Sequence, residues 1–555
     1  MQRHDDPAST IRAYHEVTKH GFEAYAPGPG GLDWATQPDP FLRFAGAQTI
    51  PLPFPTEDGG PTFSSVWEGQ MLPPRSLDLT SIGALLYDSL AISAWKQAGA
   101  SRWALRVDPS SGNLHPTECY VLSERLPSAP GGPMVAHYAP KEHLLEVRMH
   151  LQPRTVSALL EGLPRPALLI GLSSIHWRES WKYGERALRY CNHDLGHAIG
   201  ALALAAASQG WTARLCDALS TEEVDQLLGT GEERGVESEQ GECLLALTPH
   251  ARPAPIDWRP SPESVAEVGA LEREGTPNAL SPSHVPWPHL AGAARAIRKG
   301  PDSHLPSAGP SARLRASDAT VARATPFRTA VRSRRSALDF DGVGTMGATD
   351  LFLMLTSLDP QHPAPLWEAL RWSAMVQVVL YLHRVKGVEP GLYVLPRGTD
   401  AQEHLREAMD PAFAWARVEG APEGLPLRLL RAGDARDAAM HGSCHQQIAS
   451  DGCLAVSMLV PFEQTIERHG AWAYPRMFWE CGLLGQALYL LAPAMGLRAT
   501  GIGCFFDDPI HRLLGLHDRT YQCLYNFAIG HPVEDRRLTT LPAYAASLVG
   551  QRRSG

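Results

Sequence analysis

An internal duplication is the feature of this sequence that most constrains its fold. Residues 194–229 align without a gap on residues 480–515, an offset of 286 positions. The two segments share glycines at the positions of Gly196 and Gly210, and both end in Leu-Leu-Gly. Similarity at a fixed offset is the signature of a repeated structural unit, and a merely similar Ala/Leu composition would not match glycines at both helix ends. We therefore expect two related α+β domains, each with a small-residue helix, a turn and a second short helix.

The overall composition agrees with two domains and narrows the class of protein. The chain has 555 residues, 44% of them apolar, which is too long for one typical core. Its net charge of −9, without a long basic run, argues against nucleic-acid binding. No apolar stretch reaches about 18 residues and the N-terminus is polar and charged, so we expect neither a membrane span nor a signal peptide. Nine cysteines without a CxxC pair indicate reduced thiols in a cytoplasmic protein.

Composition along the chain predicts four segments. Sequence rich in Pro, Gly and aromatic residues suggests an arm wrapped over a core, and a stretch dense in Pro, Ser and Ala suggests a connector. The predicted segments are an N-terminal arm at 1–73, a first domain at 74–259, a connector at 260–326 and a second domain at 327–550. Residues 79–95 predict a helix with Thr80 or Ser81 as its N-cap, and residues 287–299 predict a short helix within the connector.

The two copies differ at loops that suit a ligand. Only the first contains Pro109-Ser-Ser-Gly-Asn113, just before a strand-like run. Only the second contains Thr500-Gly-Ile-Gly-Cys504, whose glycines let a backbone approach a flat ligand or simply form a tight turn. The second copy also opens with Val331-Arg-Ser-Arg-Arg-Ser336, which suits either a phosphate or a solvated helix entry. A further arginine pair, Arg536-Arg537, follows a Gly-His-Pro sequence near the C-terminus.

A Lys-Tyr pair precedes the small-residue helix of the first copy only. At the 286-residue offset, Lys182 and Tyr183 correspond to Arg468 and His469. A lysine beside a tyrosine can lower the pKa of the phenol, which would make an acid/base pair. The alternative is a lysine that covers apolar surface and a tyrosine that packs.

Two histidines lie one helical turn apart in the first copy. His193 and His197 have the i, i+4 spacing found in metal sites. The segment lacks the glutamate of an HExxH motif, and no third group of ligands is evident in the sequence. We therefore expect no metal ion.

Taken together, these motifs resemble the FMN-dependent nitroreductase family. Pro109–Asn113 resembles the family's PSxGN loop, Arg334-Arg335-Ser336 its N-terminal RRS, and Gly501–Phe505 its flavin-facing loop. In the first copy, GNLHPTE, WKYGERALRY and DLGHA resemble the SagB-type dehydrogenase, or thiazole/oxazole oxidase, branch of that family. Residues 14–20 and 32–41 resemble the long tandem members of this branch.

The resemblance implies an α+β fold and a dimer fused into one chain. In the family, a mostly antiparallel sheet wrapped by helices forms an obligate dimer with FMN at the interface. Here the two copies would form an intrachain pseudo-dimer, so we expect a monomer. One composite FMN site would combine the PSSGN loop of the first copy with the arginines and glycine loop of the second. The opposite site would be inactive, because residues 372–379 lack a PSxGN sequence.

The resemblance also implies roles for individual residues. The implied flavin-binding residues are Ser110, Ser111, Asn113, Arg334, Arg335, Ser336, Gly503, Cys504 and Arg537. Among them, the arginines and Ser336 would hold the ribityl phosphate, and Gly503 and Cys504 would present backbone N–H groups to the ring. Lys182 and Tyr183 match the Lys-Tyr pair that serves dehydrogenation in azoline oxidases. The chain departs from the family at Leu338, which replaces the second arginine of RRSxR.

The expected function is FMN-dependent oxidation. The favoured substrate is an azoline ring, or a similar group, in a modified peptide or other small natural product, and a peptide-cyclising enzyme is a candidate partner. O₂ would then reoxidise the flavin. Two alternatives remain: an NAD(P)H-dependent reductase of nitro compounds or quinones, and a flavin-free scaffold within a peptide-modifying complex. Neither nucleic acid nor membrane is an expected partner.

Overall fold

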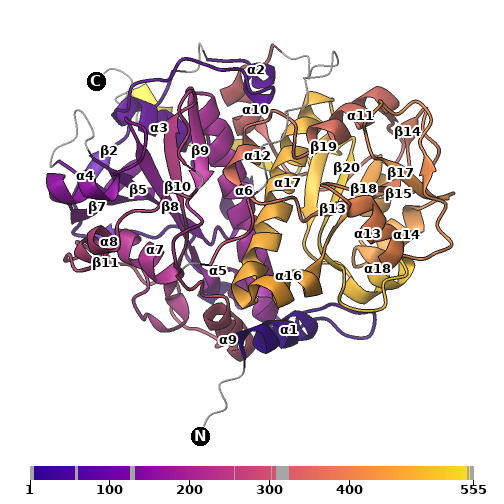
Figure 1. The fold of residues 1–555 in the computed structure, drawn as a ribbon, viewed down its shortest axis with the longest axis horizontal. Coiled ribbons are helices and arrows are strands. Elements are labelled where there is room, and N and C mark those ends of the chain that lie inside the picture. Colours follow the sequence, from indigo (N-terminus) through magenta and orange to yellow (C-terminus); the bar gives the residue numbers. More distant parts are fainter. Residues whose placement is uncertain are drawn as a thin grey trace, which may run out of the picture.

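Two copies of one sheet-and-helix unit lie side by side (Figure 1). The computed structural model describes residues 6–56, 60–124, 132–255, 257–301, 303–307, 324–546 and 549–550. Part of the predicted connector, residues 308–323, lies outside this range. The long helices α6 (Ala187–Ala207) and α17 (Tyr474–Ala494) run between the copies at the centre of the molecule (Figure 1).

Each copy is built on a seven-stranded sheet in which every neighbouring pair of strands is antiparallel. The first sheet has the order β2 (Thr49–Pro51), β7 (Leu144–His150), β6 (Met134–Ala139), β5 (Thr117–Ser123), β8 (Leu168–Ile175), β10 (Glu239–Pro249) and β9 (Trp211–Leu215). The second has the order β16 (Ala416–Arg417), β17 (Arg428–Ala432), β15 (Gly391–Leu395), β13 (Gln377–Leu382), β18 (Leu454–Val460), β20 (Gln522–Gly530) and β19 (Arg498–Ile502). The shared order β5-β8-β10-β9 and β13-β18-β20-β19 confirms the duplication and the α+β class.

Helices cover both faces of the sheets, which is why central strands such as β5 and β18 are buried along their whole length. The remaining helices before the second copy are α1 (Pro7–Val17), α2 (Phe63–Trp67), α3 (Leu79–Tyr87), α4 (Pro153–Leu159), α5 (His176–Tyr183), α7 (Thr221–Leu228), α8 (Pro262–Gly269) and α9 (Pro288–Ala296). Those of the second copy are α10 (Phe327–Ser333), α11 (Ala348–Ser357), α12 (Leu366–Ala369), α13 (Ala401–Ala408), α14 (Arg436–Gly442), α15 (Ile448–Asp451), α16 (Phe462–His469) and α18 (Asp507–Leu513).

The helices α6 and α17 cross at a pair of glycines. A Cβ atom at Gly196 would lie 2.9 Å from the Cα of Gly482 and 2.3 Å from the carbonyl oxygen of Trp479. A Cβ atom at Gly482 would lie 2.2 Å from the carbonyl oxygen of His193. These two glycines are equivalent positions of the duplication, so the helices meet each other at the same point of each copy. The crossing therefore marks the pseudo-twofold axis of the fused dimer.

Segments at both ends of the second copy also bind to the first copy, one through strand pairing and one through an ion pair. Strand β21 (Thr539–Leu541) adds to β3 (Ile92–Ala98), which pairs in turn with β4 (Ser101–Arg106). On α10, Arg328 forms a two-pronged contact with the buried Asp88 at 2.8–3.1 Å. The remaining short strands are β1 (Phe44–Ala45), which pairs with β11 (Thr276–Pro277), and β12 (Met346–Gly347), which pairs with β14 (Val385–Lys386). The copies are thus interlocked rather than merely adjacent.

The predicted helix over residues 79–95 is wrong in its cap and in its length. The helix α3 ends at Tyr87 and begins after Asp78, whose carboxylate accepts from the backbone N–H of Ser81 at 2.8 Å. Ile92 and the residues after it form β3 instead, because β4 and β21 offer hydrogen-bond partners that the local sequence does not reveal. The helix predicted within residues 287–299 is confirmed as α9.

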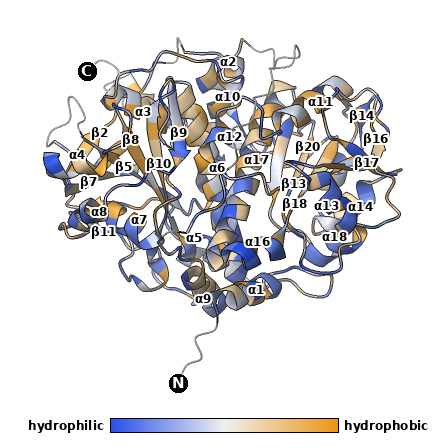
Figure 2. Cartoon of the chain, viewed as in Figure 1, coloured by the Kyte–Doolittle hydropathy of each residue, from blue (hydrophilic) through white to orange (hydrophobic). Residues whose placement is uncertain are grey.

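Apolar residues concentrate in the sheets and in the central helices, whereas outer helices such as α13 and α16 are largely hydrophilic (Figure 2). Within the described ranges, none of the helices combines the length and the apolar character that crossing a lipid bilayer requires.

The glycine crossing yields a prediction about stability. Gly482→Ala places a methyl group against the backbone of α6, so we expect the free energy of unfolding to fall by about 1–3 kcal/mol or more. Gly292→Ala is the matched control: it lies in α9 with no atom within 4 Å of the added Cβ, and alanine favours a helix by up to about 1 kcal/mol. Urea unfolding of both variants measures the difference. Equal midpoints would contradict the close crossing.

Candidate active site

A cavity of about 310 Å³ opens where the two copies meet. Its walls come from the PSSGN loop and α5–α6 of the first copy, and from the segment after α10 and the end of β19 of the second copy. The predicted site residues that line it are Ser110, Ser111, Asn113, Tyr183, Ser336, Gly503 and Cys504. The structure thus brings together loops that are almost 400 positions apart in the chain.

The PSSGN loop is held from below by Asp194 on α6. The carboxylate of Asp194 accepts from the backbone N–H of Ser111 at 3.0 Å and from its hydroxyl at 3.1 Å. The hydroxyl of Ser110 accepts from the backbone N–H of His115 at 2.8 Å. Gly112 and Asn113 both adopt left-handed φ values, of 61° and 57°. A non-glycine residue in this conformation persists only where its surroundings enforce it, so the loop is pre-organised.

Two buried carboxyl groups share the space beneath this loop. Burial raises the pKa of Asp194 to about 7, although hydrogen bonds from Ser110 and Ser111 oppose the shift. Burial and the neighbouring Asp194 raise the pKa of Glu179 well above its usual range. Neither residue was predicted from the sequence. The available signal was spacing, because Glu179, Lys182 and Tyr183 lie at i, i+3 and i+4 on one face of α5.

Lys182 and Tyr183 reach the PSSGN loop. A Cβ atom at Gly112 would lie 2.8 Å from the Tyr183 hydroxyl and 3.0 Å from the Lys182 Nζ. The expectation that Lys182 lowers the pKa of Tyr183 is wrong. Burial raises that pKa well above 10, and the neighbouring Glu179 raises it further. Tyr183 is therefore a neutral phenol at neutral pH.

The arginines after α10 form a positively charged corner beside the cavity. The guanidinium of Arg334 is buried and donates to the carbonyl oxygens of Val107 at 3.1 Å and Arg106 at 3.2 Å, two residues just before the PSSGN loop. Its Nη1 is buried without a hydrogen-bond partner among the described residues. Burial and the neighbouring Arg334 lower the pKa of Arg335 to about 10. Because this positive charge is only partly neutralised, the corner suits an anionic group.

Two further predicted positions behave differently. Arg537 lies outside the cavity: its side chain is 89% exposed and pairs with Asp535 at 2.8 Å. Leu338 lines the cavity at the position where the family has an arginine. In the glycine loop, a Cβ atom at Gly503 would collide with the ring of Tyr190 at 2.1 Å, so glycine is needed there for packing whether or not a ligand approaches.

The predicted histidine pair is buried in the junction between the copies. The ring of His193 stacks on that of Tyr525 with 3.9 Å between centroids. His197 lies within 3.3 Å of the amide oxygen of Gln486 and 3.2 Å of the Tyr525 hydroxyl, and burial lowers its pKa to about 3. In the ranges that the structure describes, no group of three or more His, Cys, Asp or Glu side chains is arranged to hold a metal ion.

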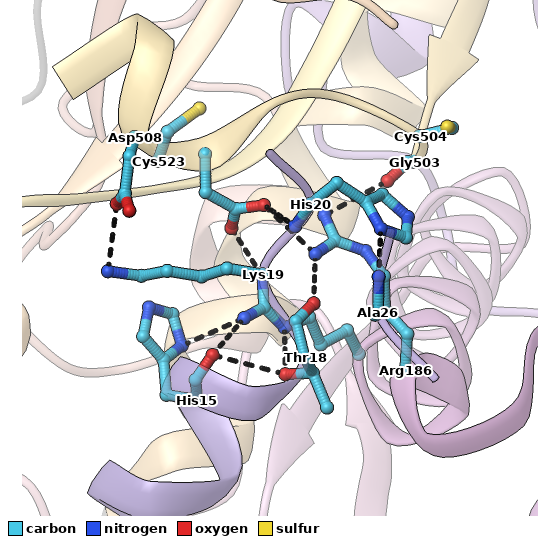
Figure 3. A network of polar contacts seen from close by, with 12 residues as sticks. His15, Thr18, Lys19, His20, Ala26, Arg186, Gly503, Cys504, Asp508 and Cys523 are labelled. Atoms are coloured by element: carbon cyan, nitrogen blue, oxygen red, sulfur yellow. Dashed lines mark hydrogen bonds and ion pairs between the residues drawn. The ribbon is translucent and has the colours of Figure 1, made fainter. Parts of the chain in front are cut away.

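A buried charged network joins the N-terminal arm to both copies (Figure 3). Asp507, at the start of α18, accepts from Arg186 at 3.0 Å, from Arg189 at 2.7 Å and from the backbone N–H of His20 at 3.0 Å. Burial alone would raise the pKa of Asp507, but the two arginines hold it well below its usual range. Arg186 also donates to the carbonyl oxygens of Thr18 and Gly503. The arm is therefore anchored directly behind the cavity wall.

The equivalent position in the other half of the pseudo-dimer is built differently. Glu480 replaces Asp194 and accepts from the backbone N–H of Met375 at 3.0 Å and from Arg397 at 2.8 Å. Opposite it, where the second copy has Gly503, the first copy has Asp217, which accepts from the backbone N–H of Leu305 at 3.3 Å. Leu305 of the connector therefore contacts this position. The space around it forms differently lined cavities, one of about 370 Å³ beside Leu305 and one of about 690 Å³ beside Glu480 and Arg397.

Comparison with solved structures identifies the class of fold. A putative nitroreductase from Anabaena variabilis has 22% sequence identity and a TM-score of 0.67, and the match covers 96% of this chain and 100% of that chain. The two proteins therefore share a fold across both copies. The nitroreductase family model matches residues 96–236 and again residues 397–531. The chain thus carries two nitroreductase-family domains.

More distant matches each cover one part of the chain. A chain of the E. coli microcin synthetase McbBCD complex has 16% identity and a TM-score of 0.27, covering 43% of this chain and 92% of that chain. A putative nitroreductase in complex with FMN from Exiguobacterium sibiricum has 12% identity and a TM-score of 0.21, covering 39% and 92% respectively. No curated protein sequence matches this chain.

The histidine geometry yields a prediction about metal content. Because His193 and His197 are packed against aromatic rings, we expect the purified protein to carry no stoichiometric zinc, iron or nickel. Elemental analysis by mass spectrometry measures this directly. One metal per chain that disappears in the His193→Ala, His197→Ala double variant would contradict the prediction.

Proposed function

We propose that this protein is an FMN-dependent oxidoreductase that binds one FMN in the cavity between its copies. The observation that carries the proposal is the meeting of the PSSGN loop with Ser336 and Gly503 in a single cavity. Beside it lies the buried Nη1 of Arg334, which has no hydrogen-bond partner in the described part of the chain. Membership of the nitroreductase family supports flavin chemistry. The second position has no PSxGN sequence and has Asp217 in the place of Gly503, which supports one flavin per chain.

The residues present fit FMN. Arg334, Arg335 and Ser336 supply cationic donors and a hydroxyl for a phosphate group. The backbone around Gly503 and the PSSGN loop, held by Asp194, would enclose the rest of the cofactor. Bound FMN would supply a hydride acceptor, and the protein supplies position and proton handling.

For the reaction, we propose dehydrogenation of an azoline ring or a similar group in a modified peptide or natural product. Such a substrate loses a hydride and a proton. Tyr183, a neutral phenol at the cavity wall, orients the substrate and passes the proton on, with Lys182 beside it. Asp194 lines the same cavity and has a pKa near 7, so at neutral pH a substantial fraction of it is ionised and can accept that proton.

The name of the nitroreductase family favours reduction of nitro compounds, so the second candidate function we propose is reduction of nitro compounds or quinones by NAD(P)H. Anaerobic mixing distinguishes the two. Bleaching of the flavin absorbance by an azoline peptide but not by NADPH supports the first, and bleaching by NADPH alone supports the second. Protein that stays colourless after addition of FMN would instead support the remaining hypothesis, a flavin-free scaffold. We further propose a cytoplasmic monomer, because fusion buries the dimer interface and the cysteines form no CxxC pair.

The arginine corner yields a prediction about flavin binding. The wild-type protein should hold one FMN per chain, and the Arg334→Ala, Arg335→Ala variant should bind FMN more weakly, by about 1.5–3 kcal/mol for each charge-assisted hydrogen bond removed. Arg436→Ala is the control, since that side chain is exposed and pairs only with Asp434 among the described residues. Flavin fluorescence titration measures the Kd, and circular dichroism checks the fold. Two flavins per chain, or an unchanged Kd in a folded double variant, would contradict the site.

The Lys-Tyr pair yields a prediction about turnover. Lys182→Ala and Tyr183→Phe should retain FMN while substrate oxidation slows by about 10²–10⁴-fold, the usual effect of removing a positioned acid/base group. Arg468→Ala and His469→Phe change the equivalent positions of the second copy and should keep the wild-type rate. Single-turnover flavin reduction measures the rate. A full-rate Tyr183→Phe enzyme would remove the phenol from the reaction, and loss of FMN would assign the pair to packing.

A further inference from the structure

Two of the nine cysteines meet at the wall of the cavity. The Sγ atoms of Cys444 and Cys504 are 2.7 Å apart, and both side chains are partly exposed, whereas the other seven cysteines are buried. Cys504 follows β19 and lines the cavity. Cys444 lies between α14 and α15, 60 positions earlier in the chain. The proximity is therefore a tertiary arrangement and not a local CxxC motif.

The turn that carries Cys444 is held in a costly conformation. Cys444 and the adjacent His445 both have left-handed φ values, of 52° and 57°, which non-glycine residues rarely adopt. Two hydrogen bonds anchor the turn to the loop opposite: Gln446 donates to the carbonyl oxygen of Cys504 at 3.0 Å, and Phe506 donates to that of Gly442 at 2.8 Å. Residues in such conformations cluster at functional sites, because they persist only where the surrounding structure enforces them.

The surroundings activate one thiol and not the other. His20 on the N-terminal arm accepts from the backbone N–H of Ala26 through Nδ1 at 2.8 Å (Figure 3). Its Nε2 therefore carries the proton that can be donated to Cys504. The Cys444 thiol and His20 lower the pKa of Cys504 to about 5, although burial opposes them. The hydrogen bond to Cys504 and burial raise the pKa of Cys444. The other titratable groups that face the pair are Tyr25, Tyr183, Arg186, Tyr190 and Asp507.

We propose that Cys504 and Cys444 form a redox-active dithiol that reduces hydroperoxides reaching the cavity. The Cys504 thiolate attacks the peroxide oxygen, the O–O bond breaks, and Cys504 becomes a sulfenic acid while hydroxide, or the alkoxide of an organic peroxide, leaves. The Cys444 thiol then displaces water from that sulfur and closes a disulfide. With hydrogen peroxide, two thiols and one peroxide thus give one disulfide and two waters.

This chemistry uses only side chains of the chain itself and does not require flavin. It also fits the position of the pair, since a flavin oxidase that passes electrons to O₂ produces hydrogen peroxide next to this cavity wall. Only this source of the peroxide rests on the proposed function; the dithiol chemistry does not. A disulfide at this point would join the cavity loop to the α14–α15 turn covalently.

The test treats the reduced, desalted full-length protein with one equivalent of hydrogen peroxide and maps thiols by peptide mass spectrometry. We expect a Cys444–Cys504 disulfide with the seven buried cysteines still reduced. In Cys444→Ser, one equivalent should leave Cys504 as a sulfenic acid, because no second thiol resolves it, and a second equivalent of peroxide should carry it on to sulfinic acid. In Cys504→Ser, Cys444 should remain a thiol. Two free thiols after treatment of the wild type, or a disulfide to another cysteine, would overturn the proposal.

Alkylation tests the activated thiol separately. At pH 6, iodoacetamide should modify Cys504 of the wild type at least 10-fold faster than Cys444, since an ordinary cysteine is almost fully protonated at that pH. His20→Phe should slow this reaction while leaving the disulfide able to form at pH 9. Equal rates for the two cysteines in the wild-type protein would remove the assignment of Cys504 as the attacking thiol, whatever the flavin content.

Discussion

The close crossing of α6 and α17 is the constraint on which the rest of the structure depends. With no side chain at Gly196 or Gly482, the two helix backbones come into direct contact. Any larger residue would separate the copies and widen every distance across their junction, including those that join the PSSGN loop to the glycine loop. Because the contact falls at equivalent positions, it also sets the pseudo-twofold relation that places each loop of one copy opposite the other.

The two copies differ in the residues that surround equivalent positions on either side of this pseudo-twofold axis. Both copies keep a buried carboxylate on the central helix, Asp194 or Glu480. It accepts hydrogen bonds from the loop before β5 in the first copy and from the loop before β13 in the second. In the first copy this leaves a loop with two left-handed residues facing a cavity. In the second, Arg397 pairs with Glu480, Leu305 of the connector contacts Asp217, and the neighbouring cavities are lined by different residues. The same position on the two central helices thus supports two differently lined sites, only one of which combines the PSSGN loop with the glycines of residues 500–504.

Buried ion pairs and hydrogen bonds connect the N-terminal arm to the candidate active site. Arg186 and Arg189 are desolvated, and a buried cation is tolerated only when it is paired and hydrogen-bonded. Their partners come from the other two parts of the chain: Asp507 and the carbonyl oxygen of Gly503 in the second copy, and the backbone at Thr18 in the arm. This arrangement fixes His20 beside Cys504, which no local feature of the arm would suggest.

The sequence by itself determined the duplication and the α+β class, because periodic patterns and glycine positions encode backbone conformation locally. The pairing of unlike loops was implied only by the resemblance to the nitroreductase family. It did not determine where Ile92 would go, since that strand is formed by partners from the far end of the chain. It also pointed in the wrong direction for the pKa of Tyr183 and offered no reason to separate Arg537 from the other arginines. The sequence likewise did not predict that Cys444 and Cys504 lie close together. Burial and electrostatic neighbours arise only when distant segments pack, so these properties were decided by the tertiary structure alone.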